Sequence, residues 1–498
     1  MKKFRIQFFI LSILSGFLLA ISFPKINAFY FAWIAFVPLL FCCSNKSTTL
    51  QSLLYGFIAG FVCYCVSCIW LLFFLNYHFL FFQAILFSFI IYSYYGFFYS
   101  LWAVSFNYIQ KKFNATIVIL FSSASWVFIE FVRTYLLTFG WNLIGYSQSS
   151  FKYVVQISDI TGVYGVSFAV ILINVLMYYW LQNVKEKKYL LVAVCIFIAI
   201  FIYGYVKFNK YSNPYGEKIS VGIIQPNIDQ YKKWDTGYRN EILNTLKQNV
   251  AIFKNKQVDL IAYPETVLPG SLEYKQNIKD VVKETAKYSK LSLIGGSSFS
   301  NHNGTNMYNS IFAITKEGLI LDKHNKNHLI IFGEFVPFRK VLPKYFRTFN
   351  SLGDFSKDNC MNVFNYDNLF IGSTICSENF FPNLSRKLVL NGAKILTNHA
   401  NDAWFLDSFA PYQHFVMNVF RAVENRKNVI ISANTGLSAI IDSAGNIYNL
   451  TKLNENVSLI SNAYQNSDIT IYTKVGNIFV YICIIFVIVI LFIITREK

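Results

Sequence analysis

Charged residues are scarce in this sequence. Asp, Glu, Lys and Arg together make up 14% of its 498 residues, whereas soluble globular domains carry roughly 25%. Acidic residues are the rarer kind, with 26 of them against 44 basic residues, so the formal net charge is +18. A basic balance is also typical of nucleic-acid-binding proteins, but these basic residues stand in loops beside apolar runs, which indicates membrane topology. We therefore expect much of the chain to face lipid, and we expect no nucleic-acid partner.

The sequence also lacks a metal-binding pattern of cysteines. Most of its nine cysteines lie in or beside apolar runs, where a thiol behaves as a small apolar side chain. Cys63 and Cys65 have a CxC spacing, but no second pair follows, and their neighbours are apolar or aromatic. A zinc site needs about four such ligands, so we expect no metal and no other cofactor. Cys360 and Cys376 are the two cysteines in the polar part of the chain.

Long apolar stretches are abundant, since 54% of the residues are hydrophobic and 18% aromatic. A membrane span needs roughly 20 apolar residues. We count eight candidate spans, of which the second and fifth are the weakest: 7–22, 27–43, 52–75, 79–106, 115–138, 160–182, 189–206 and 475–494. A signal peptide is the alternative for the first stretch. Pro24 and Lys25 lead straight into the next apolar run, so we favour an uncleaved span.

The distribution of basic residues predicts the orientation of these spans. Cytoplasmic loops of membrane proteins carry an excess of Lys and Arg. With the N-terminus in the cytoplasm, the inner segments hold Lys2, Lys3, Arg5, Lys46, Lys111, Lys112, Lys185, Lys187, Lys188, Arg496 and Lys498. The outer turns then hold Lys25, Asn76, His78 and Arg133. The asymmetry stays in phase through eight spans, so we expect the long segment between the last two spans to lie outside the cytoplasm.

That long segment has the pattern of an α/β domain. Apolar strand-like runs alternate with amphipathic segments, which favours a layered α/β sandwich. We expect strands near 218–224, 258–263, 291–298, 307–315, 369–375, 393–398 and 428–434, and helices near 237–255, 277–289, 380–391 and 412–427. The expected domains are a seven-span membrane domain at 1–212, the α/β domain at 213–472, and a final span with its tail at 473–498.

Three short motifs in the α/β domain carry reactive side chains. Glu265 follows an apolar strand, at the kind of position where catalytic groups gather in α/β sheets, although such a carboxylate is more often a solvated loop residue. Lys326 lies in a basic run, which is normally a solvated face. Cys376 lies between an apolar strand and a predicted helix, where a thiol has a lowered pKa and acts as a nucleophile. The alternatives for Cys376 are a buried structural cysteine or a disulfide with Cys360.

Taken together, in this order, the three motifs resemble the Glu-Lys-Cys triad of the nitrilase, or carbon–nitrogen hydrolase, superfamily. The eight predicted spans narrow the resemblance to the apolipoprotein N-acyltransferase family, and it covers nearly the whole chain. The further matching residues are Glu130, Arg133, Gly145-Tyr146-Ser147-Gln148, Lys232-Lys233-Trp234-Asp235, Tyr308-Asn309-Ser310, Phe332-Gly333-Glu334, Asn401-Asp402-Ala403-Trp404-Phe405, His414, Arg421-Ala422-Val423-Glu424 and Asn434-Thr435-Gly436.

The resemblance implies a nitrilase-like αββα sandwich, outside the cytoplasm, on the inner membrane of a bacterium. It implies that Glu265 is the general base, that Lys326 stabilises the oxyanion, and that Cys376 carries the acyl group as a thioester. The donor would be a phospholipid, with phosphatidylethanolamine expected, and the acceptor the free amine of a diacylglyceryl-modified apolipoprotein. Supporting roles are implied for Glu334, Glu378 and the loop aromatic Trp234.

The sequence departs from the family pattern at two points near the site. Ser377 follows the nucleophile where a tyrosine is frequent, which puts in doubt an aromatic hydroxyl that holds the lipid headgroup. Its backbone N–H remains available for an oxyanion hole. Ile331 stands where the family has a proline before Phe332-Gly333-Glu334. None of the triad residues is affected.

Two other functions are alternatives to the acyltransferase interpretation. A membrane-tethered nitrilase-type amidase would use water as the acceptor, but a single anchor would suffice for it. A transporter would need ionisable residues inside its spans, and apart from Glu130 and Arg133 the predicted spans are nearly free of them. Those two residues also fit an interfacial pair whose charged ends reach the membrane surface.

Overall fold

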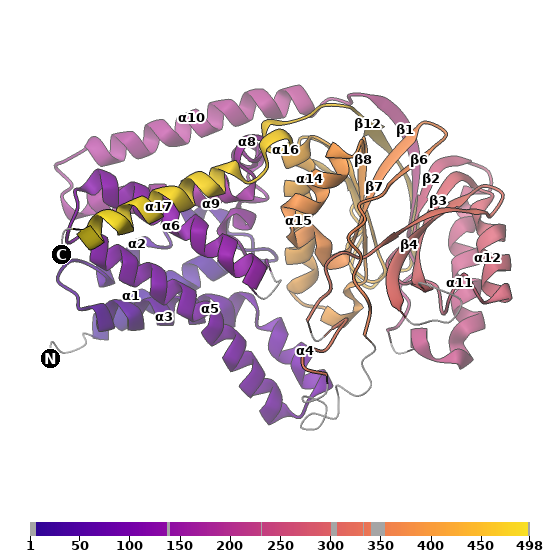
Figure 1. The fold of residues 1–498 in the computed structure, drawn as a ribbon, viewed down its shortest axis with the longest axis horizontal. Coiled ribbons are helices and arrows are strands. Elements are labelled where there is room, and N and C mark those ends of the chain that lie inside the picture. The colour runs from indigo at the N-terminus through magenta and orange to yellow at the C-terminus, as the bar shows by residue number, and fades with distance from the viewer. Residues whose placement is uncertain are drawn as a thin grey trace. The chain divides into compact units, whose positions relative to one another are not determined.

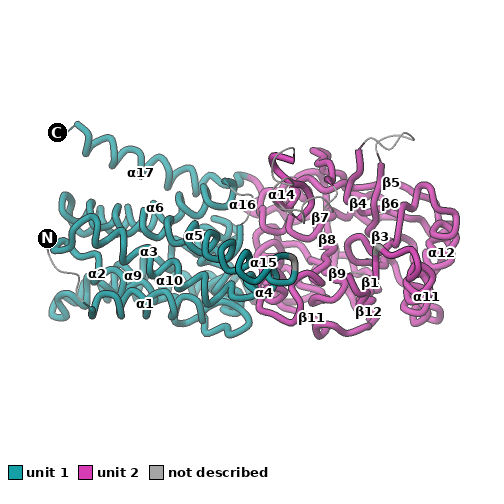
Figure 2. The backbone as a smooth tube through the Cα atoms, turned by 90° about the horizontal axis from the view of Figure 1, so that it is seen from below, with its two compact units in different colours: residues 1–208, 475–498 teal, residues 209–474 magenta. Residues whose placement is uncertain are grey.

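The computed structural model describes residues 6–136, 140–230, 232–299, 306–331, 333–339 and 354–496, together with the backbone but not the side chains of His78 and Trp234. The chain forms two compact units, Met1–Phe208 with Val475–Lys498, and Asn209–Lys474 (Figure 2). Some residues used in the sequence analysis lie outside the described part: Lys2, Lys3, Arg5, Phe332 and Lys498.

The first unit is helical. Its elements are α1 (Ile6–Ile21), η1 (Phe29–Trp33), α2 (Val37–Cys42), α3 (Thr49–Ser67), α4 (Trp70–His78), α5 (Phe81–Ile109), α6 (Ala115–Leu136), η2 (Ile144–Gln148), α7 (Lys152–Val155), α8 (Ser158–Thr161), α9 (Val163–Gln182), α10 (Lys188–Tyr211) and α17 (Ile478–Arg496). Within the described residues, six of these helices are long and apolar enough to cross a membrane, namely α3, α5, α6, α9, α10 and α17. The first unit is thus built from several apolar helices, as a membrane bundle is.

Two of the predicted spans differ from single long helices. The stretch 27–43 forms the short 3₁₀ helix η1 and the six-residue helix α2, and the stretch 52–75 is divided between α3 and α4. The helix α1 is also short, with 16 residues. Hydropathy alone misses these breaks, because the residues at the breaks are as apolar as those within the helices.

Close packing of α3 against α5 depends on small residues. A Cβ atom added at Gly56 would lie 2.7 Å from the backbone oxygen of Tyr99, and one added at Gly60 would lie 2.6 Å from the ring of Tyr99. Glycine therefore lets the two helices approach each other, as small residues do in membrane bundles, where no hydrophobic effect drives helices together.

Glu130 and Arg133 are buried inside the first unit, with 0% and 2% exposure. The guanidinium group donates to the hydroxyl of Tyr64 and lies against the ring of Tyr95, 5.2 Å from its centroid. Glu130 Oε1 accepts a hydrogen bond of 2.7 Å from the backbone N–H of Ile144. The interfacial alternative for this pair is therefore wrong, because both charged groups point into the protein and stabilise the segment that follows α6.

The second unit contains two six-stranded sheets. The first has the order β12-β1-β2-β3-β4-β5 and the second β11-β10-β9-β8-β7-β6. The strands are β1 (Glu217–Gln225), β2 (Val258–Ala262), β3 (Ser289–Phe299), β4 (Met307–Thr315), β5 (Ile320–Asn325), β6 (Val363–Tyr366), β7 (Leu369–Ile375), β8 (Ile395–Ala400), β9 (Val429–Ala433), β10 (Ala439–Ile441), β11 (Ile447–Tyr448) and β12 (Val457–Gln465).

Helices cover the outer faces of both sheets, which gives four layers within this unit (Figure 1). Helices α11 (Arg239–Val250) and α12 (Gln276–Ala286) pack on the first sheet through one apolar core. A second core lies between the sheets and includes Ile223, Leu293 and Ile375. Helices α14 (Pro382–Leu390) and α15 (Ala410–Asn425) cover the second sheet. The predicted αββα sandwich is thus the observed layering.

Each predicted strand and helix of the second unit is present, with shifts of a few residues at its ends. The sequence analysis missed the strands β5, β6, β10, β11 and β12, which are short or partly exposed. β5 matters most for function. It pairs with β4 and ends at Asn325. The basic run therefore begins inside a strand, and Lys326, which follows that strand, is buried.

Candidate active site

Glu265 lies in the turn that follows β2. The parallel strands β2 and β3 pair in register, with Ala262 opposite Leu293, so the turn passes directly over β3. A Cβ atom at Gly295 would lie 2.2 Å from the backbone oxygen of Pro264, so only glycine allows this approach. Glu265 itself is 7% exposed, which rules out the solvated-loop alternative for this carboxylate.

Lys326 is buried, with 1% exposure, beside two carboxylates. Its Nζ lies 3.2 Å from Oε1 of Glu265 and 2.9 Å from Oε1 of Glu334. The backbone fixes its position, because the N–H of Lys326 donates to the carbonyl oxygen of Asn309 at 2.8 Å. The solvated-face alternative for the basic run is therefore wrong at this residue.

Asn309 is a residue of this site for which no role is predicted from the sequence. Its Nδ2 donates to Oε1 of Glu265 at 2.7 Å and to Oε1 of Glu334 at 2.9 Å. The amide therefore bridges the two carboxylates that contact Lys326. The Tyr308-Asn309-Ser310 motif marked this position, but its function depends on the pairing of β3, β4 and β5.

The charges in this cluster shift the pKa values of its members. Burial alone would raise the pKa of Glu265, but Lys326, the Asn309 amide and Lys233 together hold it below its usual value. Burial opposes the charged form of Lys326, but Glu265 and Glu334 raise its pKa above the usual range. At neutral pH the site therefore contains a carboxylate and an ammonium group in direct contact.

Lys233 is a second buried lysine of the site, with 2% exposure. Its Nζ donates to Oγ1 of Thr266 at 2.5 Å and to the backbone oxygen of Glu265 at 3.4 Å. Burial lowers its pKa to about 8, against the opposing pull of Glu265 and Cys376. Lys233 is recognised in the sequence only as part of a motif, because the burial of one lysine among many cannot be predicted from the sequence.

Cys376 begins the 3₁₀ helix η7 (Cys376–Phe380), directly after β7. Its φ is +52°, a left-handed conformation that costs a non-glycine residue about 1–2 kcal/mol. The side chain is 7% exposed. Both Cys376 and Cys360 are free thiols, so the disulfide alternative is wrong. The neighbouring Ser377 is also buried.

The expected lowering of the Cys376 pKa is wrong for this structure. Burial raises the pKa of the thiol well above 9, and the negative charge of Glu265 raises it further. Lys326 and the backbone N–H of Asn401 act in the opposite direction but are weaker. Cys376 therefore rests as a thiol, and it would need a base close by to act as a nucleophile.

Glu378 connects the Lys326 segment with the Cys376 segment. Its Oε1 accepts from the backbone N–H of Asn327 at 2.6 Å, and its Oε2 accepts from the backbone N–H of Ile375 at 2.8 Å. Burial would raise the pKa of this carboxyl, but His324 and these backbone donors hold it low. The ring of His328 stacks on Phe381 at 4.3 Å, which agrees with a structural role.

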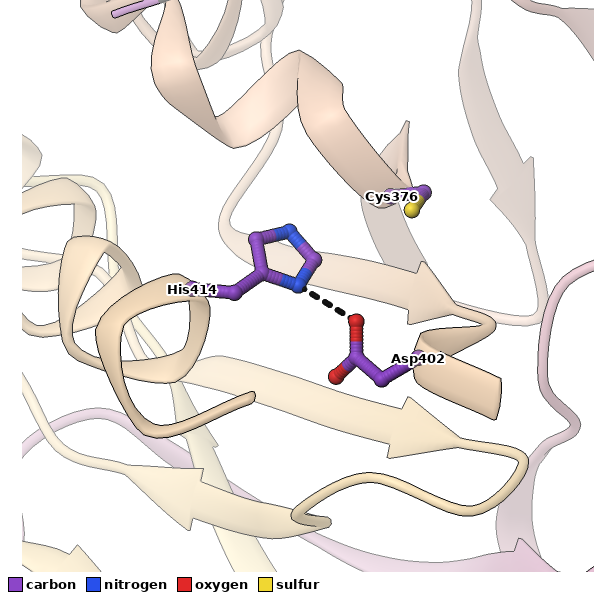
Figure 3. Close-up of side chains that lie close together, drawn as sticks. All are labelled: Cys376, Asp402 and His414. Atoms are coloured by element: carbon purple, nitrogen blue, oxygen red, sulfur yellow. Dashed lines mark hydrogen bonds and ion pairs between the residues drawn. The ribbon is translucent and has the colours of Figure 1, made fainter. Parts of the chain in front are cut away.

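Asp402 and His414 form a hydrogen-bonded pair beside Cys376 (Figure 3). Nδ1 of His414 lies 2.8 Å from Oδ1 of Asp402, and one ligand-type atom of each of the three residues lies within 4.8 Å of the others. Sulfur, nitrogen and carboxylate oxygen are all ligands that zinc accepts, so these three side chains are the ones that could hold a metal ion within the described part of the chain.

Comparison with known proteins identifies the family. Residues 15–176 match the apolipoprotein N-acyltransferase N-terminal domain, and residues 220–466 match the carbon-nitrogen hydrolase family. Apolipoprotein N-acyltransferase of Geobacter metallireducens is 32% identical over 96% of this chain and 93% of its own length. The Rickettsia prowazekii protein of that name is 32% identical over 73% of this chain and 74% of its own.

This chain belongs to the apolipoprotein N-acyltransferase family. Apolipoprotein N-acyltransferase 1 of Treponema denticola adds a further match, 27% identical over 96% of this chain and 94% of its own length. The two family matches fall one on each compact unit. As a member of this family, the chain is an acyltransferase and a membrane protein.

The structure of this N-acyltransferase family member brings most of the residues singled out in the sequence together. Glu265, Lys326 and Glu334 are in direct contact, and Cys376 lies within electrostatic reach of Glu265 and Lys326. Glu378 and Ser377 lie beside them. The backbone of Trp234 forms part of the 3₁₀ helix η3 (Lys232–Trp234), while its side chain lies outside the described residues.

Proposed function

We propose that this protein transfers an acyl chain from a phospholipid to the free N-terminal amine of diacylglyceryl-cysteine apolipoproteins, through a thioester on Cys376. Membership of the family supports N-acylation of lipoproteins. The observation that carries the mechanism is the placement of one buried thiol beside a buried Glu265–Lys326 pair.

In the first half-reaction, Glu265 takes the proton of the Cys376 thiol while the sulfur attacks the ester carbonyl carbon. Lys326 stabilises the negative charge that develops on the carbonyl oxygen, together with the backbone N–H of Ser377. Such fixed donors supply several kcal/mol in a site that excludes water. The proton then passes from Glu265 to the glycerol oxygen as the C–O bond breaks, and lysophospholipid leaves.

In the second half-reaction, the amine of the apolipoprotein attacks the thioester. Glu265 accepts the proton that the amine loses and passes it to the sulfur as the C–S bond breaks, which restores both the thiol and the carboxylate. Glu334 and Asn309 keep Lys326 and Glu265 in position through both steps. Splitting the transfer in two allows an ester to be converted into an amide through an activated acyl carrier.

The proposal includes the topology expected from the charge pattern. Eight spans would place the catalytic domain on the periplasmic side of a bacterial inner membrane, with domains at 1–212, 213–472 and 473–498. The donor would be phosphatidylethanolamine. Both substrates are lipids anchored in a membrane, so a helical unit gives their acyl chains a route to the thiol without leaving the bilayer.

A two-stage experiment tests the ping-pong cycle. Purified protein is first incubated with phosphatidylethanolamine alone, and we expect a hydroxylamine-sensitive acyl adduct on Cys376 with about one equivalent of lysophospholipid. A diacylglyceryl-cysteine peptide is then added, and the acyl chain should move to its amine. The matched control is the same peptide with an acetylated amine, which should leave the adduct in place.

The opposite outcome would identify a different activity. Many turnovers of free fatty acid from phospholipid alone, without a hydroxylamine-sensitive adduct, would show that water is the acceptor. In that case the membrane-tethered amidase would be the correct interpretation, although a single anchor would suffice for it and the described residues contain six helices long and apolar enough to cross a membrane.

A further inference from the structure

The pair formed by Asp402 and His414 has no role in the mechanism above, although it lies beside the nucleophile. Both side chains are buried, with 4% and 3% exposure. Gly436 makes room for the carboxylate, because a Cβ atom at this glycine would lie 2.3 Å from Oδ2 of Asp402. The backbone that carries His414 is held by Asn379, whose Nδ2 donates to the His414 carbonyl oxygen at 3.2 Å.

The ring of His414 is also held in place. It packs edge-on against Phe380, with ring centroids 5.5 Å apart. Its Nδ1 lies 2.8 Å from Asp402, and a carboxylate in that position fixes the tautomer and favours the protonated ring. Burial lowers the pKa of His414, but Asp402, the backbone of Cys376 and the charge of Glu265 together raise it above its usual value. The fold therefore places an imidazole, bonded to a carboxylate, beside a buried thiol.

We propose that His414 is a positioning residue for the nucleophile: its imidazolium, held by Asp402, stabilises the Cys376 thiolate. This inference rests on the proposed function and adds a second cation to it. The thiol proton still goes to Glu265 as the S–H bond breaks. The negative charge that appears on sulfur then faces a positive ring within 4.8 Å, in addition to Lys326.

Other charged groups act on the same sulfur and must be included. Glu265 and Asp402 raise the pKa of Cys376, while Lys326 lowers it. The charges of Glu265 and Cys376 both act to raise the pKa of Lys233. Glu265 also favours the protonated form of His414. These groups come from the turn after β2, the segment after β5, the helix η3 and the turn after β8, so they surround the thiol from separate elements.

The test is the pH dependence of Cys376 alkylation by iodoacetamide, followed by peptide mass spectrometry on the full-length protein in detergent. Only the thiolate reacts. We expect His414→Asn to shift the apparent pKa of Cys376 upward by at least about one unit, a tenfold loss of thiolate at pH values below both pKa values. The rates of the variant and the wild type should converge at high pH.

The direction in which Asp402→Asn changes the reactivity of Cys376 distinguishes two possible roles of Asp402. If Asp402 acts through His414, this substitution lowers the reactivity of Cys376 near pH 7, because the ring loses the carboxylate that keeps it protonated. If Asp402 acts only as a negative charge beside the sulfur, the same substitution raises the reactivity, and the proposal is overturned. In the His414→Asn variant, where no imidazolium remains, the added Asp402→Asn substitution should raise the reactivity of Cys376.

A neutral buried histidine provides the matched control. Burial lowers the pKa of His399 to about 4, and its ring bonds to the backbone oxygen of Tyr263 and to Thr397. His399→Gln should therefore leave the alkylation profile unchanged. If His414 has a purely structural role, His414→Asn should lower the alkylation rate of Cys376 by the same factor at every pH, or leave it unchanged. Either result would refute the inference. Alkylation needs neither lipid nor lipoprotein, so the result stands apart from that of the acyl-transfer experiment.

Discussion

The ammonium nitrogen of Lys326 lies 3.2 Å from Oε1 of Glu265, and both side chains are buried. The contact belongs to a balanced cluster, in which Glu265 and Glu334 face Lys326 and Lys233. Buried ion pairs contribute little to stability when intact, but removal of one partner is costly because it leaves a buried charge uncompensated. Glu265 and Lys326, the proposed base and oxyanion donor, are thus also structural partners.

Lys326→Met should lower acyl transfer by several orders of magnitude, about 10³-fold or more, because the oxyanion loses its fixed cation. It should also destabilise the fold by about 3–5 kcal/mol, since Glu265 and Glu334 lose their shared partner. Lys326→Arg is the matched variant, which keeps the charge and should restore stability more than activity. Single-turnover acylation and thermal unfolding measure the two effects separately. Near-wild-type turnover of a folded Lys326→Met protein would refute the assigned role.

Acid should destabilise the second unit, because carboxyl groups whose pKa is lowered in the folded protein then take up protons. The pKa values of Glu265 and Glu378 are both below their usual 4.5 in the folded protein. The stability they contribute is present above that value and is lost as the pH falls through the lower folded pKa. Thermal unfolding in detergent between pH 6 and 3 should show this loss. Glu378→Gln should flatten the curve, and an unchanged slope would contradict the shift at that carboxyl.

Glu378→Gln should reduce activity without removing a reacting group. A glutamine amide can accept with its oxygen but not with its nitrogen, so the bonds from Asn327 and Ile375 cannot both survive. We expect a loss of about 1–3 kcal/mol in stability and a fall in the rate of thioester formation. Cys376 should still be acylated, only more slowly. Full loss of the adduct in a folded protein would instead assign Glu378 a direct part in the chemistry.

Cysteine labelling on intact cells tests the orientation. Cys360 is exposed and should react with a membrane-impermeant maleimide from outside, while Cys360→Ser should abolish that signal. A cysteine introduced at Lys187, which is also exposed, should react only after the cells are opened. External labelling at position 187 would reverse the topology derived from the positive-inside rule.

The sequence predicts much of the catalytic domain, for physical reasons that differ from residue to residue. Glu265 and Cys376 directly follow strongly apolar strands, and strand ends in α/β sheets converge on one site. Lys326 is harder, because the strand β5 before it is largely polar or exposed, and only the family motif identified it. The layering follows from strand–helix alternation. The strands β10 and β11 are too short to be recognised, with 3 and 2 residues, and β12 is largely half-buried and lacks a continuous apolar run.

Relations that depend on three-dimensional register lie beyond the sequence. Asn309 bridges Glu265 and Glu334 because β4 pairs with both β3 and β5. Asp402 and His414 meet beside Cys376 because a turn and a helix fold back on the second sheet. The raised pKa of Cys376 is also a tertiary effect, since burial outweighs the position at the start of a helix.

The left-handed backbone of Cys376 means that the chain gives up stability at the position of the proposed nucleophile. Alanine at 376 removes the thiol but keeps the strained φ of +52°, whereas glycine removes both. We therefore expect Cys376→Gly to be more stable than Cys376→Ala by about 1 kcal/mol in thermal unfolding, with both inactive. The backbone at this position favours glycine, whereas the proposed thioester chemistry requires a cysteine there.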